Sequence, residues 1–197
     1  MNRTLERNIV EYSLSEDTIA RLEDTFDRCT KDETLIFKDS LLNRVSCTRN
    51  GVQTVNVIPQ IDLNSINEIY KHVHAYISNL YQNRLYYYFV TLDHIHMIHY
   101  REHGHQLIHT HSQIEDHSYI IYLNDSDACT RIYCRDSFLD VESRRGKIVL
   151  FDAGLYHEST ECSTERKILV GSVRFVHKVW APRTNTPLDL DASLAQG

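Results

Sequence analysis

The sequence predicts a mainly β protein in which a strand-rich second half forms a barrel supported by helices from the first half. Two observations lead to this prediction. From residue 86 onward, short apolar or alternating runs are separated by brief turn segments, which is typical of β-strands. Before residue 86, two stretches carry apolar residues at helical spacing, as expected for helices that pack one face against a sheet.

Composition is that of an ordinary globular protein and argues against several kinds of partner. The 197 residues are 42% hydrophobic and 24% charged, which suits one domain with a substantial core. The formal net charge of −6 argues against broad binding to nucleic acid or anionic membranes, because both need a basic surface. The N-terminus has no apolar signal region, and no run approaches the roughly 20 apolar residues of a membrane span. The five cysteines form no metal-type pairs and are expected to be reduced thiols of a cytoplasmic protein.

Two helices are expected in the first half. Ser13 and Glu16 are spaced as a capping box before one apolar stripe, and Ser65 and Glu68 are spaced in the same way before a second, stronger stripe. In a capping box the two side chains satisfy each other's backbone amides at the start of a helix. The apolar positions of the two stripes are Ile19, Leu22, Phe26 and Cys29, and Ile66, Ile69, Val73, Ile77 and Leu80.

A β-hairpin is expected between the two helices. Asn50 and Gly51 separate two alternating runs, residues 45–49 and 52–57. Both residue types tolerate the positive φ angles that a tight hairpin turn requires. The sequence therefore predicts a turn at this dipeptide.

The chain is interpreted as a single domain of residues 1–181. Residues 1–85 would form the helical and hairpin support, and residues 86–181 would form the β core. Residues 182–197 are polar and are predicted to be a C-terminal tail.

The strand-rich half contains a spaced set of tyrosine, glycine, histidine and arginine residues. The set runs Tyr100-x3-Gly104-x4-His109-x-His111, then Tyr122-Leu123-Asn124, then Gly146-x4-Phe151-x5-His157, and then Arg166. Residues two apart on a strand face the same way. His109 and His111 are therefore expected to share a face, and Tyr100 is expected to share one with His96 and Ile98.

This pattern resembles the prolyl-hydroxylase-like branch of the Fe(II)/2-oxoglutarate-dependent dioxygenases over roughly residues 86–177. That family has Tyr-x3-Gly-x4-His-x-Asp, then Tyr-Leu-Asn, then a glycine, a hydrophobic strand, a histidine and a basic residue further on. The resemblance implies a double-stranded β-helix, a jelly-roll or cupin-like barrel of about eight strands. The chain departs from the family at the metal-binding aspartate, whose position is occupied by His111.

By resemblance, His109 and His157 are two ligands of the metal, and three readings of the third ligand remain open. In the favoured reading, His111 completes a three-histidine triad, since imidazole also suits Fe(II). In the second, Glu115 or Asp116 supplies a carboxylate from a bulging segment. In the third, two protein ligands leave an open position, as in halogenating members of the superfamily, although those carry a small residue where this chain has His111.

The resemblance also implies a cosubstrate pocket. Arg166 would bind the distal carboxylate of 2-oxoglutarate, since a guanidinium forms a two-pronged hydrogen bond with a carboxylate. Tyr122 and Tyr100 match family tyrosines that bond or border the cosubstrate, and Ser118 is a weaker candidate. The remaining histidines of the region have no assigned role and are expected at the surface or in loops: His94, His99, His103 and His105.

Together these features predict an Fe(II)- and 2-oxoglutarate-dependent oxygenase. It would hydroxylate a C–H bond of a peptidyl substrate, with proline as the leading case, or of a small molecule. O2 and 2-oxoglutarate would be consumed and succinate and CO2 released, with ascorbate as a candidate reductant. One alternative is a three-histidine, cupin-like metal dioxygenase that does not use 2-oxoglutarate. Another is a non-catalytic metal-binding barrel that acts as an interaction module.

Overall fold

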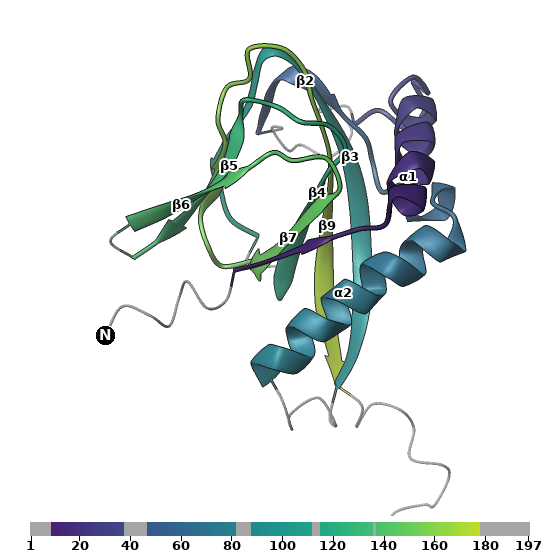
Figure 1. Ribbon diagram of the computed structural model, residues 1–197, viewed down its shortest axis with the longest axis vertical. Coiled ribbons are helices and arrows are strands. Elements are labelled where there is room, and N and C mark those ends of the chain that lie inside the picture. Colours follow the sequence, from purple (N-terminus) through teal and green to yellow (C-terminus); the bar gives the residue numbers. More distant parts are fainter. Residues whose placement is uncertain (1–8, 38–46, 82–87, 112–114, 136, 178–197) are drawn as a thin grey trace, which may run out of the picture.

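A single curled antiparallel sheet of nine strands forms the centre of the molecule (Figure 1). The computed structural model describes residues 9–37, 47–81, 88–111, 115–135 and 137–177, so the predicted tail lies outside the described residues. The strand order is β1-β7-β4-β9-β3-β8-β5-β6, and β2 pairs with β3 outside this path. The strands are β1 (Val10–Ser13), β2 (Thr48–Gln53), β3 (Tyr88–His109), β4 (His117–Tyr122), β5 (Cys129–Cys134), β6 (Ser137–Glu142), β7 (Lys147–Asp152), β8 (His157–Ser159) and β9 (Arg166–His177). The mainly β class is confirmed.

The sheet has an apolar core on each side. Along β3, Met97 belongs to the core between the sheet and the helices, whereas Ile98 and Tyr100 belong to the core inside the curl. This division follows from the strand period of two, which sends successive side chains to opposite faces. Both cores are closely built, with Met97, Ile98 and Tyr100 at most 1% exposed.

Two helices cover the outer face of the sheet, α1 (Glu16–Cys29) and α2 (Leu63–Tyr81), and a short 3-10 turn, η3 (Ile58–Gln60), precedes α2 (Figure 1). The carboxylate of Glu68 on α2 accepts hydrogen bonds from the Ser15 amide at 2.6 Å, the Ser15 hydroxyl at 2.7 Å and the Thr18 hydroxyl at 2.5 Å. These bonds tie the start of α1 to α2. No helix among the described segments is long and apolar enough to cross a membrane.

Both helices form, but their capping residues differ from the prediction. Ser13 is the last residue of β1, and the hydroxyl of Ser15 caps α1 by accepting the Thr18 amide at 3.3 Å. The second helix begins two residues before Ser65, and Asp62 accepts the Ser65 amide at 3.0 Å. Neither predicted capping box forms, because the amides that the observed caps accept belong to Thr18 and Ser65 and not to a glutamate. Serine and aspartate nearby serve as the caps instead.

The predicted hairpin turn at Asn50 and Gly51 is wrong. Both residues lie inside the single strand β2, which pairs along β3, and Asn50 has a φ of 47°. The positive φ serves a bulge in the strand pairing, since the register shifts between Arg49 and Gly51. Strands β1 and β2 also show that the first half contributes to the sheet as well as covering it.

A bulge in β3 lies opposite this irregularity. The partners of Arg49 and Gly51 on β3 are His105 and Tyr100, so the four residues 101–104 of β3 lie opposite the single residue Asn50 of β2. Gly104 is needed here because a Cβ atom would lie 2.7 Å from the Arg101 carbonyl oxygen and 2.8 Å from that of Asn50. The glycine of the sequence motif thus permits a close backbone approach.

Candidate active site

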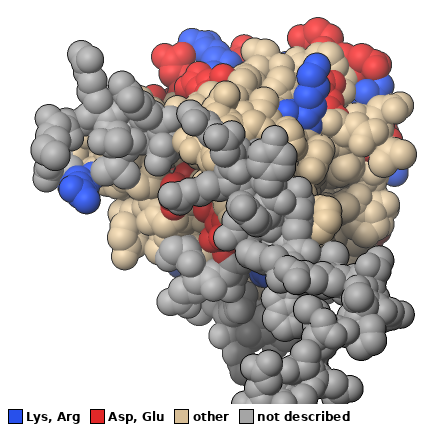
Figure 2. All heavy atoms as spheres, turned by 90° about the horizontal axis from the view of Figure 1, so that it is seen from below, with Lys and Arg blue, Asp and Glu red and all other residues tan. Residues whose placement is uncertain are grey.

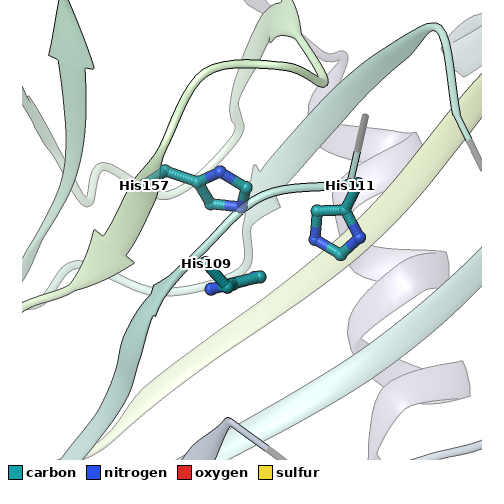
Figure 3. Close-up of side chains that lie close together, drawn as sticks. All are labelled: His109, His111 and His157. Carbon is teal, nitrogen blue, oxygen red and sulfur yellow. The ribbon is translucent and has the colours of Figure 1, made fainter. Parts of the chain in front are cut away.

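Three histidines converge where β3 ends and β8 begins, with their rings pointing toward one another (Figure 3). His109, the last residue of β3, pairs with His157, the first residue of β8. His111 follows β3, and its backbone amide donates to the Ala153 carbonyl at 3.0 Å. The candidate ligand nitrogens of the three rings all lie within 4.8 Å of one another. This spacing suits three ligands on one face of a transition metal.

Hydrogen bonds fix which nitrogen of each paired ring faces the cluster. The Nδ1 atoms of His109 and His157 lie 2.7 Å and 3.0 Å from the carbonyl oxygens of Leu107 and Leu155. A carbonyl can only accept, so each Nδ1 carries the proton and each Nε2 keeps its lone pair for a metal. Burial lowers the pKa of both rings, and for His157 the pKa falls to about 3, with the neighbouring His109 adding to the effect. Both imidazoles are therefore neutral, as metal ligands must be.

His111 is held by a carboxylate instead of a carbonyl. Its Nδ1 lies 3.3 Å from Oε1 of Glu115, whose side chain is 2% exposed. Burial acts to raise the pKa of Glu115, but the close approach of the His111 and His94 nitrogens to its Oε1 outweighs burial and lowers the pKa to about 2. The Nε2 of His111 is buried without a hydrogen-bond partner among the described residues. A buried ring nitrogen without a protein partner, beside two other imidazole nitrogens with their lone pairs available, is suited to bind a metal.

Neither carboxylate proposed as an alternative to His111 joins this group of ligand atoms. Asp116 is exposed, and its Oδ2 accepts the backbone amide of Phe175 at 2.7 Å. Glu115 contacts the far side of the His111 ring. The geometry thus groups His109, His111 and His157.

Arg166 is completely buried and has no acidic partner among the described residues. Its guanidinium donates to the hydroxyl of Thr130 at 2.7 Å and to that of Ser159, while Nε has no hydrogen-bond partner within the described segments. The ring centroids of Tyr122 and Tyr100 lie 5.3 Å and 5.7 Å from its Cζ atom. Burying an unpaired charge is costly, and an anionic ligand would relieve that cost.

Strand β8 links Arg166 to the histidines. Ser159 lies two residues after His157, so their side chains share a face and are separated by about 7 Å along the strand. Thr130 and Ile132 of β5 pair with Ser159 and His157. The guanidinium therefore contacts β8 at Ser159, two residues along the strand from His157, inside the same curl of the sheet.

A cleft of about 710 Å³ opens beside the histidines and is lined by His109 and His111. His96 and Ile98 also line it, as the shared strand face predicts. Gln106 lies between this cleft and the arginine, because it lines the cleft and accepts the Tyr100 hydroxyl at 3.2 Å. On the face shown in Figure 2, the lysine and arginine side chains of the described residues are scattered among acidic ones and form no continuous basic patch.

Two sequence expectations need correction here. His94 is not a surface histidine: its side chain is 19% exposed, lines the cleft and contacts Glu115 Oε1 through Nε2 at 3.2 Å. His94 lies two residues before His96 and four before Ile98 on one strand, and this spacing already indicated that His94 faces the same cleft. Ser118 is fully buried, but its hydroxyl donates to Glu115 at 3.2 Å, which places it beside the histidines and not among the partners of Arg166.

No protein-family model and no curated protein matches the sequence. Solved structures do share its fold. A prolyl-4-hydroxylase from Pseudomonas putida superposes with a TM-score of 0.67 at 18% identity, over 85% of this chain and 92% of that one. A prolyl hydroxylase from Trichoplax adhaerens, in complex with a peptide fragment of the hypoxia inducible factor oxygen degradation domain, gives 0.65 at 12% identity, over 88% and 85%. A collagen prolyl hydroxylase of Paramecium Bursaria Chlorella virus-1, in complex with 2-oxoglutarate, gives 0.58 at 12% identity, over 86% and 97%. The chain therefore has the jelly-roll fold of the 2-oxoglutarate- and Fe(II)-dependent oxygenases, with prolyl hydroxylases among the structures that share it.

Proposed function

We propose that this protein is an Fe(II)- and 2-oxoglutarate-dependent oxygenase. His109, His111 and His157 would hold the metal, and Arg166 would bind the distal carboxylate of 2-oxoglutarate with Tyr122 and Tyr100 beside it. One observation carries the proposal: a buried arginine without an acidic partner among the described residues lies one short step along β8 from three converging imidazoles. A metal and a dicarboxylate together account for both features.

Bound Fe(II) and 2-oxoglutarate would supply the oxidising chemistry, in which O2 and 2-oxoglutarate are consumed, a substrate C–H becomes C–OH, and succinate and CO2 leave. The protein's own contribution is orientation. The carbonyl bonds at His109 and His157 hold their rings with Nε2 toward the metal. The guanidinium of Arg166 would fix one end of the cosubstrate so that its other end reaches the cluster, which removes most of the entropic cost of bringing the groups together.

The proposed substrate is a peptidyl side chain, with proline as the leading case, or a small molecule. The cleft beside His109 and His111 is open to solvent and offers about 710 Å³, which is within the range of small-ligand pockets. Among structures with this fold, the Trichoplax adhaerens prolyl hydroxylase is in complex with a peptide. Assaying succinate release with candidate peptides would distinguish the two substrate classes.

Binding of 2-oxoglutarate is the first test. Adding it to the anaerobic Fe(II) protein should produce a metal-to-ligand absorption band whose growth gives the affinity. Arg166→Ala should weaken that affinity by about 2–5 kcal/mol, roughly 30-fold to several-thousand-fold, because the carboxylate loses its buried partner. Arg166→Lys should fall between, since it keeps the charge and loses the two-pronged geometry.

The matched control is Arg131→Ala, because Arg131 is a partly exposed arginine on β5 that pairs with Asp140 at 2.8 Å. It should bind 2-oxoglutarate as the wild type does. If wild type gives no band, or if Arg166→Ala binds equally well, the three-histidine dioxygenase without 2-oxoglutarate or the non-catalytic barrel becomes the better account.

Metal binding is the second test. The wild type should bind one Fe(II) or Mn(II) per chain, and His109→Ala and His157→Ala should each abolish it. His99→Ala is the control, since His99 pairs with Glu165 at 2.9 Å away from the cluster. His111→Ala should cost far more affinity than Asp116→Ala, and His111→Asp should keep iron. Stoichiometric metal in both His109→Ala and His157→Ala would disprove the assignment.

A further inference from the structure

Glu115 lies directly behind the His111 ring, and the proposed function gives it no role. We propose that Glu115 is a positioning residue for His111, the third metal ligand. Through its contact with the His111 ring, Glu115 supplies indirectly the negative charge that a carboxylate ligand would supply directly. This inference rests on the proposed metal site.

Two histidine rings and a serine hydroxyl surround the buried carboxylate of Glu115. Its side chain is 2% exposed, and its Oε1 lies 3.3 Å from Nδ1 of His111 and 3.2 Å from Nε2 of His94. Its Oε2 accepts the hydroxyl of Ser118 at 3.2 Å. Among the described ion pairs, those that involve Glu115 use histidine and none uses lysine or arginine. A buried carboxylate needs such partners, and one of them is a residue of the metal cluster.

The contact distinguishes His111 from the other two histidines. His109 and His157 direct Nδ1 at neutral backbone carbonyls, whereas His111 directs Nδ1 at a carboxylate. A carboxylate behind an imidazole fixes the tautomer, orients the ring and raises the electron density on the nitrogen that faces the metal. Three neutral imidazoles alone would leave the charge of a divalent metal uncompensated, and Glu115 restores one negative charge beside them.

His94 approaches the same Glu115 oxygen as His111 and is itself held in place. Its Nδ1 lies 2.9 Å from the Ser172 hydroxyl and 3.4 Å from Asp93. Asp93 in turn pairs with Arg174 at 3.2 Å, at the lining of the cleft. The carboxylate is therefore anchored through β3 and β9 and cannot turn away from His111 without breaking several contacts.

Cobalt(II) is a suitable probe because its visible bands report ligand strength as well as occupancy. The dissociation constant and the band positions would be measured for the wild type, Glu115→Gln and Asp116→Asn. Glu115→Gln keeps the size and an acceptor oxygen and removes only the charge, so we expect binding about 10- to 100-fold weaker with shifted bands. Asp116→Asn removes the adjacent, exposed carboxylate and should leave both quantities unchanged. A Glu115→Gln protein with wild-type affinity and spectrum overturns the inference.

Two further variants separate charge from packing. Glu115→Asp keeps the charge on a shorter side chain and should retain more cobalt affinity than Glu115→Gln; the reverse order shows that side-chain size matters and charge does not. In a His111→Asp background the third ligand is itself a carboxylate, so adding Glu115→Gln should leave the cobalt dissociation constant nearly unchanged. A double-mutant cycle measures this coupling between the two positions. A penalty of undiminished size overturns the charge role.

The histidine variants keep this inference separate from the proposed function. If His109→Ala and His157→Ala lose cobalt while Glu115→Gln does not weaken it, only the present inference fails. If both histidine variants retain cobalt, the proposed metal site itself fails.

Discussion

Arg166 combines complete burial with partners that carry no formal negative charge. Two hydroxyl groups and two aromatic rings surround it, and its Nε has no hydrogen-bond partner in the part of the chain that the structure describes. A guanidinium moved from water into such surroundings loses more hydration than hydroxyl groups return. Arg166 is therefore expected to destabilise the fold in the absence of an anionic ligand, which is the usual relation between stability and function at a binding site.

This relation predicts an unusual stability change for Arg166→Met. Methionine fills much of the same volume without a charge, so the ligand-free variant should unfold with a free energy higher than wild type by about 1–4 kcal/mol, the range seen when buried ionic groups become apolar. Urea unfolding in the presence of a chelator would measure it. Arg131→Met, at a partly exposed ion pair, should change stability by less than about 1 kcal/mol. A less stable Arg166→Met protein would show that the hydroxyl bonds outweigh the buried charge.

The individual site residues divide by how far they could be predicted. The resemblance of the spaced motif to the dioxygenase family singled out His109, His157 and Arg166, and the structure brings the two histidines together and buries the arginine nearby. The contacts of Glu115 with His111 and His94 were missed. Glu115 lies only four residues from His111, but His94 reaches the same carboxylate from β3, and no local pattern encodes that approach.

At the scale of elements, His117 fastens α2 to the sheet. It is the first residue of β4 and is 1% exposed. Its Nδ1 lies 3.2 Å from the Tyr76 hydroxyl and its Nε2 lies 3.0 Å from the Tyr81 hydroxyl. Burial lowers the pKa of this imidazole below its ordinary 6.5. The ring must therefore stay neutral for the helix to remain docked.

Docking of α2 is consequently expected to weaken in mild acid. A group whose pKa is lower in the folded state gives stability that is complete above its unfolded pKa, near 6.5 for His117. That stability is lost as pH falls from there through the folded value. His117→Gln keeps a hydrogen-bonding side chain that does not titrate. Urea unfolding at about pH 7.5 and about pH 5.5 should show a larger loss for wild type than for the variant. Equal losses would mean that the other buried histidines account for the whole pH dependence.

The two helices could be predicted from the sequence, whereas the bulge at Asn50 and Gly51 could not. Helical periodicity identified α1 and α2, because an apolar stripe reflects the face that packs on the sheet. Asn50 and Gly51 were misread as a hairpin turn, since positive φ serves a bulge as well as a turn. The partner of that bulge, around Tyr100, is about fifty residues away along the chain and gives no local signal.

At the scale of the whole molecule, the site depends on the order of strands in the sheet. Strands β9, β3, β8 and β5 are consecutive neighbours in the sheet although they are scattered along the chain. His109 ends β3, His157 begins β8 and Arg166 begins β9, so pairing brings their side chains together inside the curl. The resemblance supplied this topology in outline, whereas the pairing of β1 with β7 had no sequence signal.

Because the proposed metal and cosubstrate would bridge these neighbouring strands, they should stabilise the whole fold, with the metal binding first. Each ligand at 100 times its dissociation constant adds about 2.7 kcal/mol to the free energy of unfolding. Cobalt(II) should raise the unfolding midpoint of wild type by itself, and 2-oxoglutarate should raise it further only when cobalt is present, since one end of the molecule would bind the metal.

Glutarate, which has the same length and lacks the 2-oxo oxygen, should add much less. Arg166→Met should respond to cobalt and not to 2-oxoglutarate, whereas His157→Ala should respond to neither. Stabilisation of Arg166→Met by 2-oxoglutarate, or of wild type without metal to the same extent, would contradict a cosubstrate bound between the histidines and this arginine.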